Sequence, residues 1–376
     1  MKLRSVVTIG SALALAGLVC GCGGSSPAPT SSASGTTSGT ASVAALGGTA
    51  HYQALEALYH KAVSAKQHSV VIYGPSAGTD TTLYKAFQKS FPGITVTGVP
   101  VVGPPMSAKV SAEMSSGKHV ADIAYTGSTD MLLYTKQGWL IPFTPATAPP
   151  ASQLAAQAVG PGHAFYGFTA AVAGMVYNTN AVKASDVPQQ WTGFLDPKWK
   201  GKLAMYDPTA IGEMEDIFAH LALVPGDGGV MAGLKAQGVQ LSPSTSITGP
   251  LTAVAQGAKN IALGIAYAFY QLAKAGGAPV GFSLLKSDNY TVILYGGQLK
   301  GAPDPLASQL YEDWLYTPQA ATAVAAEGAY STVLGAAAPH GLPALASIPA
   351  MPVIPLDGII AADNASIAKA QGYWGS

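Results

Sequence analysis

"SVVIYGPSAGTDTTLYKAFQKSFPG", residues 69–93, contains a strand, a loop and a helix in succession. The apolar run ends at Gly74, and Leu83, Phe87 and Phe91 then recur every four residues before the Pro-Gly stop. The same order of strand, glycine-containing loop and helix recurs over residues 120–139 and 201–223. Strands that alternate with helices usually pair in parallel, so the sequence predicts an α/β fold with a mostly parallel sheet.

The composition limits the class of protein. A chain of 376 residues predicts two domains, and 48% apolar residues supply ample core. Only 10% of residues are charged and the formal net charge is zero, which argues against a nucleic-acid partner. Arg4 is the only arginine, so the mature protein lacks the bidentate guanidinium group that usually selects anionic ligands.

The sequence of the N-terminal 50 residues predicts an export segment and a tether, not a part of the folded body. Residues 1–22 have a short basic start and an apolar run, as in a signal peptide. The end of this run resembles a bacterial lipobox, and we expect Cys22 to carry the lipid; an ordinary secretory signal is the alternative. The second cysteine, Cys20, lies in the same segment, so no disulfide framework is expected in the mature body. Residues 23–50 predict a flexible tether.

Three loops follow predicted strands and open predicted helices, where ligands of α/β proteins lie. All three are small and rich in hydroxyl groups, and helix N-termini can bind polar ligands without arginine. Helix capping is the structural alternative for Asp130, Asp207 and Glu213. The candidate ligand-binding residues in these loops are Ser76, Ala77, Gly78, Thr79, Gly127, Ser128, Thr129, Asp207, Thr209 and Glu213.

The first loop also has the Gly-x-Ser-x-Gly pattern of a hydrolase nucleophile elbow. Asp304 and His340 would complete the chain order of a catalytic triad around Ser76. No strand–helix loop precedes Ser76, however, and a hydrolase takes part of its oxyanion hole from such a loop. A binding loop is therefore the favoured interpretation, and the secreted serine hydrolase is the alternative.

From about residue 52 onward the chain resembles the extracellular solute-binding lipoproteins of bacterial ABC importers. Within them it is closest to the type II group of iron, polyamine, thiamine and aminoethylphosphonate binders. The resemblance rests most strongly on "WTGFLDPKWKGKLAMYDPTAIGE", residues 191–213. Three further segments support the resemblance and follow one another in the order expected for the family: "HVADIAYTGSTDMLLYTKQGWL", "FTAAVAGMVYNTNAV" and "LKGAPDPLASQLYEDWLYTPQA".

The resemblance implies the type II periplasmic-binding-protein fold, with two α/β lobes joined by two crossover strands and a ligand cleft between them. We place lobe one at residues 51–169 plus 286–376 and lobe two at residues 170–285. It also implies a monomeric, non-catalytic protein without a cofactor. Its partners would be a small solute, an ABC permease with its ATPase, and the membrane through the lipid anchor. Such a protein lies at the outer face of the cytoplasmic membrane or in the periplasm.

The ligand is predicted from the residues near these loops. Iron-binding members of the group carry adjacent tyrosines, whereas this chain has Tyr267 and Tyr270, three apart and without the adjacent pair. Ferric iron is therefore the alternative, and Tyr267 and Tyr270 are expected to contact an organic ligand, with core packing as the other role of Tyr267. Acidic residues without lysine in the loops favour an organic cation or zwitterion. We expect Asp207 and Tyr267 to face each other across the cleft.

Overall fold

The computed structural model describes residues 41–75, 77–78 and 80–375, which belong to one compact unit. The helices are α1 (Thr49–Ser64), α2 (Thr81–Ser90), α3 (Gly103–Ser116), α4 (Ser128–Lys136), α5 (Glu213–Leu221), α6 (Val230–Ala236), α7 (Gly249–Ala255), α8 (Tyr267–Ala275), α9 (Pro305–Trp314), α10 (Pro318–Ala326) and α11 (Leu356–Trp374). The strands are β1 (Ser69–Gly74), β2 (Thr95–Pro100), β3 (Ile123–Thr126), β4 (Tyr166–Asn178), β5 (Leu203–Tyr206), β6 (Gln240–Ser242), β7 (Ile261–Ala266), β8 (Val280–Ser283), β9 (Tyr290–Gln298) and β10 (Tyr330–Ser331).

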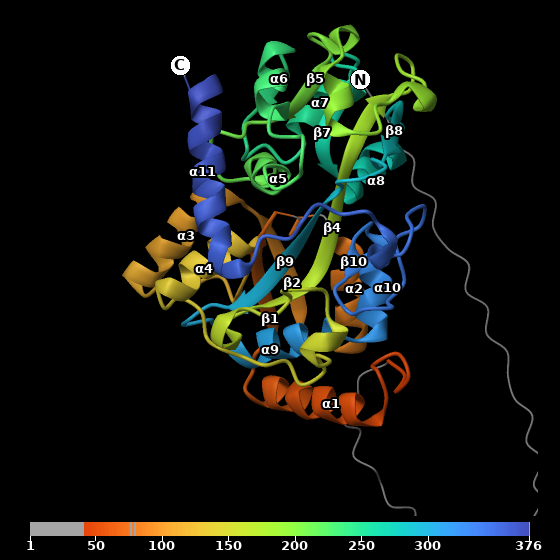
Figure 1. The fold of residues 1–376 in the computed structure, drawn as a ribbon. Coiled ribbons are helices and arrows are strands. Elements are labelled where there is room, and N and C mark those ends of the chain that lie inside the picture. The colour runs from red at the N-terminus through yellow and green to blue at the C-terminus, as the bar shows by residue number, and fades with distance from the viewer. Residues whose placement is uncertain (1–40, 76, 79, 376) are drawn as a thin grey trace, which may run out of the picture. The chain divides into compact units, whose positions relative to one another are not determined.

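One continuous sheet has the strand order β2-β1-β3-β9-β4-β7-β5-β6, with β8 and β10 also paired to β4. Three strands are mutually parallel at one end (β2, β1 and β3), and three at the other (β7, β5 and β6). The long strands β4 and β9 lie between these two groups and pair antiparallel with each other (Figure 1). They are the two crossover strands that the two-lobe fold requires.

The expectation of a mostly parallel sheet is wrong in the middle of the molecule. Every strand pair that involves β4 or β9 is antiparallel. The reason is that β4 leaves one strand group and β9 returns to it, so the two run in opposite directions through the same sheet. Helical crossovers, which produce parallel pairing, connect strands only within each of the two groups.

Two large apolar cores pack on the two strand groups. One contains Trp191, Phe194 and Leu234, which come from the segment between β4 and β6 and are almost fully buried. The other contains Phe87 of α2 and Trp314 of α9, whose rings meet edge to face 5.5 Å apart. Each strand group with its helices therefore buries its own apolar surface.

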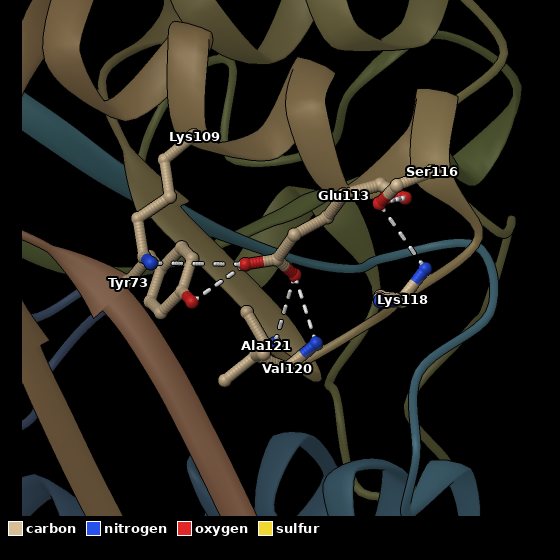
Figure 2. Close-up of polar contacts among 7 residues, drawn as sticks. All are labelled: Tyr73, Lys109, Glu113, Ser116, Lys118, Val120 and Ala121. Atoms are coloured by element: carbon tan, nitrogen blue, oxygen red, sulfur yellow. Dashed lines mark hydrogen bonds and ion pairs between the residues drawn. The ribbon is translucent and has the colours of Figure 1, made fainter.

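A buried glutamate fastens helix α3 to the sheet (Figure 2). The Glu113 side chain accepts hydrogen bonds from the hydroxyl of Tyr73 at 2.7 Å and from the backbone N–H groups of Val120 and Ala121 at 2.9 and 3.2 Å. The ammonium group of Lys109 lies 4.0 Å from the same carboxylate. Three donors and a cation compensate this buried charge and fix the chain on its way from α3 to β3.

The C-terminal helix α11 contacts elements of both predicted lobes. It packs against α4 of the first and against α5 and α6 of the second (Figure 1). Sequence patterns do not predict this helix, because its alanine-rich sequence lacks a strong apolar stripe. The exact lobe boundaries stay a prediction, with α11 linking the two.

Candidate functional site

A cavity of about 450 Å³ opens where the starts of α2, α4 and α5 converge on the two crossover strands. Residues of α8, the end of α10 and α11 complete its wall. This volume suits a small organic molecule, since ligand pockets of ~300–1,000 Å³ are usual. The starts of three helices and the middle of the sheet thus share one space, as expected for α/β proteins.

Acidic side chains dominate the polar part of this wall. Seven lining residues carry a carboxyl group: Asp80, Asp130, Glu213, Glu215, Asp216, Glu327 and Asp363. Among the described residues that line the cavity there is no lysine, arginine or histidine. The apolar part includes Tyr125, Phe269 and Val292, so the cavity offers both negative charge and apolar surface.

Four of these carboxyl groups have a buried oxygen without a hydrogen-bond partner within the described structure: Glu213 (Oε1), Glu215 (Oε2), Asp216 (Oδ1) and Asp363 (Oδ1). The Glu215 side chain belongs to a residue only 1% exposed, and Asp363 is 3% exposed. A buried acceptor without a partner is costly, because it has lost its water. A ligand that donates hydrogen bonds would supply the missing partners.

Burial shifts the titration of three of these groups. Loss of solvent, with a smaller effect of the Asp216 charge, raises the pKa of Glu213 to about 8. Burial likewise raises the pKa of Asp363 to about 6 and that of Glu215 well above its usual value. Burial therefore favours the protonated forms of these carboxyl groups, and a bound cation would favour their ionised forms.

Asp216 differs from Glu213, Glu215 and Asp363 because a histidine and a tyrosine of the protein lie against its carboxylate. Its Oδ1 lies 3.0 Å from Nδ1 of His220, and its Oδ2 accepts a hydrogen bond from the Tyr290 hydroxyl. Burial alone would lower the pKa of His220, but the hydrogen bond and charge of Asp216 raise it overall. His220 does not line the cavity, and its imidazole is the basic partner of the Asp216 carboxylate.

The tyrosine hydroxyls of the wall are also engaged. Tyr125 shares a hydrogen bond of 2.7 Å with Thr169, and Tyr206 donates to the carbonyl of Ile247 at 2.8 Å. Burial, followed by the charge of Glu213, raises the pKa of Tyr206. Phenolate oxygens are therefore not displayed to the cavity in this arrangement.

The structure brings some of the predicted site residues to the cavity and not others. Those that line it are Gly127, Ser128, Thr129 and Glu213. Those described elsewhere are Ala77, Gly78, Asp207, Thr209, Tyr267 and Tyr270. Outside the described residues lie Ser76, Thr79 and Cys22. The second and third loops thus contribute residues at the starts of α4 and α5.

The expected pairing of Asp207 with Tyr267 across the cleft is not what the structure has. Asp207 Oδ1 accepts hydrogen bonds from the backbone N–H and the hydroxyl of Thr209, so it closes its own turn. The Tyr267 hydroxyl donates to the carbonyl of His340 at 2.8 Å, and its ring packs against Tyr270 and Phe282. Neither side chain lines the cavity, and each makes its hydrogen bonds within the protein.

Sequence reasoning missed most of the acidic wall. Glu215 and Asp216 follow Glu213 in the first turn of α5, where acidic residues are also common for helix stability. Three acidic residues within the six-residue stretch "GEMEDI" could have indicated a role beyond helix capping. Asp363 could not be found this way, since it comes from α11, about 150 residues further along the chain.

The fold and the cavity define a protein with two α/β groups of strands and helices around a ligand-sized site. The chain belongs to the family of bacterial extracellular solute-binding proteins, whose pattern matches residues 118–346. Proteins of this family bind solutes and are not enzymes, so the hydrolase interpretation of Ser76 is not supported. No curated protein sequence matches the chain.

Solved structures share the fold at low sequence identity. Iron-bound HitA from Pseudomonas aeruginosa is 19% identical, with a TM-score of 0.64 over 82% of this chain and 99% of that chain. The substrate-binding protein of the ABC transporter from Agrobacterium tumefaciens is 18% identical, with a TM-score of 0.67 over 82% and 96%. AfuA from Actinobacillus pleuropneumoniae, with exogenous fructose-6-phosphate bound, is 19% identical, with a TM-score of 0.65 over 82% and 98%. The expected two-lobe type II fold is confirmed.

Proposed function

We propose that this chain is the substrate-binding component of an ABC importer and that its solute is a small organic cation or zwitterion. The solute-binding family and the fold shared with an ABC-transporter binding protein support the role in import. The observation that carries the choice of solute is the acidic wall, in which buried carboxylate oxygens lack partners and the described lining residues supply no basic side chain.

Electrostatics favours a cation strongly over an anion. Two unit charges 4 Å apart interact by ~4 kcal/mol at an effective dielectric constant of 20. Burial, followed by the charge of Asp216, raises the pKa values of Glu213 and Asp363, and a bound cation would favour their ionised forms. A phosphorylated solute such as the one bound in AfuA would instead be repelled by the ionised carboxyl groups.

Ferric iron is the other candidate, because several proteins that share the fold bind iron. The residues of this cavity fit it poorly. In the part of the chain that the structure describes, no three His, Cys, Asp or Glu residues are grouped as a metal site. Tyr267 and Tyr270 lie outside the cavity wall, and the hydroxyls of Tyr125 and Tyr206 are hydrogen-bonded to the protein.

The cellular setting follows from the family and the N-terminal sequence. An extracellular solute-binding family implies export, and none of the helices within the described ranges has the length and apolar character to cross a bilayer. We propose that a lipid on Cys22 and the tether of residues 23–50 hold the binding body near the membrane. The permease would then recognise the state in which the ligand has drawn the lobes together.

A thermal-shift screen of residues 41–376 tests the proposed function. The panel contains polyamines, thiamine, amino acids, aminoethylphosphonate, sugar phosphates and ferric citrate. A ligand at ~100 times its dissociation constant adds ~2.7 kcal/mol of stability, which is a shift of several degrees. A shift with cations alone supports the proposal, whereas a shift with anions or ferric citrate alone refutes the choice of solute.

A further inference from the structure

One part of the cavity wall, which we call the acidic floor, consists of Glu213 and Glu215 of α5 and Asp363 of α11. The carboxyl groups of Glu215 and Asp363 act on each other electrostatically, and the Asp216 charge acts on all three. Helix α11 is fixed there by the Ser366 hydroxyl, which donates to the carbonyl of Glu215 at 2.7 Å. The floor is therefore one cluster built from two helices.

Each of these three carboxyl groups keeps one buried oxygen free of hydrogen bonds within the described structure. The other oxygen of Asp363 is already used, because the Thr129 hydroxyl of α4 donates to it at 2.5 Å. The side chain is thus held in place, and Oδ1 is its oxygen without a hydrogen-bond partner. Glu215 and Asp363 are each more than nine-tenths buried and border the cavity.

We infer that this floor is a subsite for a primary ammonium group of the solute. The inference rests on the proposed function, that the solute is a cation or zwitterion, and it specifies which kind. A primary ammonium carries several N–H donors, and Glu215 and Asp363, whose carboxyl groups interact electrostatically, each have one oxygen without a hydrogen-bond partner. A quaternary ammonium carries the same charge but no donor, so it would leave these oxygens without a partner.

The aromatic residues of the wall offer a second way to bind a cation in this cavity. Tyr125 and Phe269 line the same cavity, and aromatic rings bind quaternary ammonium groups through cation–π contacts. These rings suit the apolar chain of the solute in our arrangement, with the ammonium group on the floor. The two arrangements differ in one measurable property, which is the discrimination between an amine and its fully methylated analogue.

The floor also gives α11 a role. Residues 356–374 lie beyond the segment 118–346 that matches the family, yet they supply Asp363 to the cavity. An ammonium group bound by Glu215 and Asp363 would tie α11 to α5, while Thr129 ties it to α4. The terminal helix is thus a part of the ligand site that links both predicted lobes.

The test measures binding by isothermal titration calorimetry to matched pairs of cations. The probes are 1,4-diaminobutane, spermidine, agmatine and lysine, each beside its N-permethylated analogue, with choline and thiamine as further cations without a primary alkylammonium group. The variants are Glu215→Gln and Asp363→Asn, and Asp357→Asn is the control because Asp357 is an exposed acid on the same helix. Circular dichroism confirms that each variant folds.

We expect at least one primary amine to bind and its permethylated analogue to bind about 100-fold more weakly or not at all. Each floor variant should weaken the amine by roughly 10- to 100-fold, as for a lost charge-assisted hydrogen bond, and should reduce the discrimination between the pair. The control should change neither. A purely structural role of the floor would not alter the discrimination.

The outcomes separate this inference from the proposed function. Equal binding of amine and permethylated analogue, or binding of choline or thiamine alone, overturns the ammonium subsite and leaves a cation-binding protein. Amine binding that Glu215→Gln and Asp363→Asn leave unchanged also overturns the subsite. Failure of every cation in the panel overturns both proposals.

Discussion

Asp363→Asn should stabilise the ligand-free protein, and more so as the pH rises. Burial raises the pKa of Asp363 from its ordinary value of 3.8 to about 6, so the folded protein binds this proton more tightly than the unfolded chain. The contribution of this group to stability is therefore greatest below pH 4 and is lost as the pH rises through 6. Asparagine is neutral at every pH and can still accept the hydrogen bond of Thr129.

The magnitude follows from the two pKa values. At 1.36 kcal/mol for each pKa unit, the cost of ionising Asp363 in the folded state approaches ~3 kcal/mol at pH 8 and is ~1 kcal/mol at pH 4.5. The stability gap between Asp363→Asn and the wild type should thus widen by about 2 kcal/mol over this range. The neighbouring charges of Asp216 and His220 act in opposite directions and leave the sign unchanged.

Thermal unfolding of the ligand-free proteins at pH 4.5, 6 and 8 measures this gap. The protein is first unfolded and refolded under dialysis, so that any bound cation is removed. The melting temperature of the variant should exceed that of the wild type by a few degrees at pH 8 and by less at pH 4.5. Asp357→Asn, an exposed acid on the same helix, should show no such pH-dependent gap. A gap that stays constant or shrinks with pH would refute the electrostatic reasoning.

Three further predictions use other parts of the structure. Cation affinity should rise as the pH increases from 5.5 to 8.5, because Glu213 and Asp363 must ionise to hold the cation; calorimetry at both values would contradict this if affinity were flat or fell. Glu113→Ala should lower the free energy of unfolding by about 3 kcal/mol, since it removes the acceptor of two buried donors, the Tyr73 hydroxyl and the Ala121 N–H, and of the partly buried Val120 N–H; a denaturant melt with an unchanged midpoint would count against the cluster of Figure 2. Tyr267→Phe should cost about 1 kcal/mol of stability through its lost hydrogen bond while leaving ligand affinity as it is, and a large loss of affinity would place Tyr267 in the site after all.

Local sequence signals predicted the elements that position half of the cavity. The four-residue spacing of Leu83, Phe87 and Phe91 fixes α2, and the glycine-containing loops at Gly127 and Gly212 fix where α4 and α5 begin. A helix that starts directly after a strand of an α/β sheet presents its first N–H groups at the carboxyl edge of that sheet. Such a signal needs only neighbours in the chain, so it can be read without the fold.

The same signals could not say which side chains remain available. Asp207 and Glu213 both follow β5 and look equivalent in the sequence, but Asp207 is satisfied by Thr209, whereas Glu213 keeps a buried oxygen without a partner within the described structure. The difference is made by the groups that pack around each residue. Hydrogen bonds that form within a turn compete with those to a ligand, and only the coordinates show which of the two the residue makes.

By itself the sequence predicted an export signal and the alternation of strands and helices, and its near absence of arginine already disfavoured an anionic ligand. The tertiary structure alone decided that β4 and β9 cross the sheet in opposite directions and that α11 returns to the cavity with Asp363. Periodicity and turn chemistry act over a few residues and are legible in the chain. The joining of Glu215 with Asp363 depends on packing between helices about 150 residues apart, which no local pattern encodes.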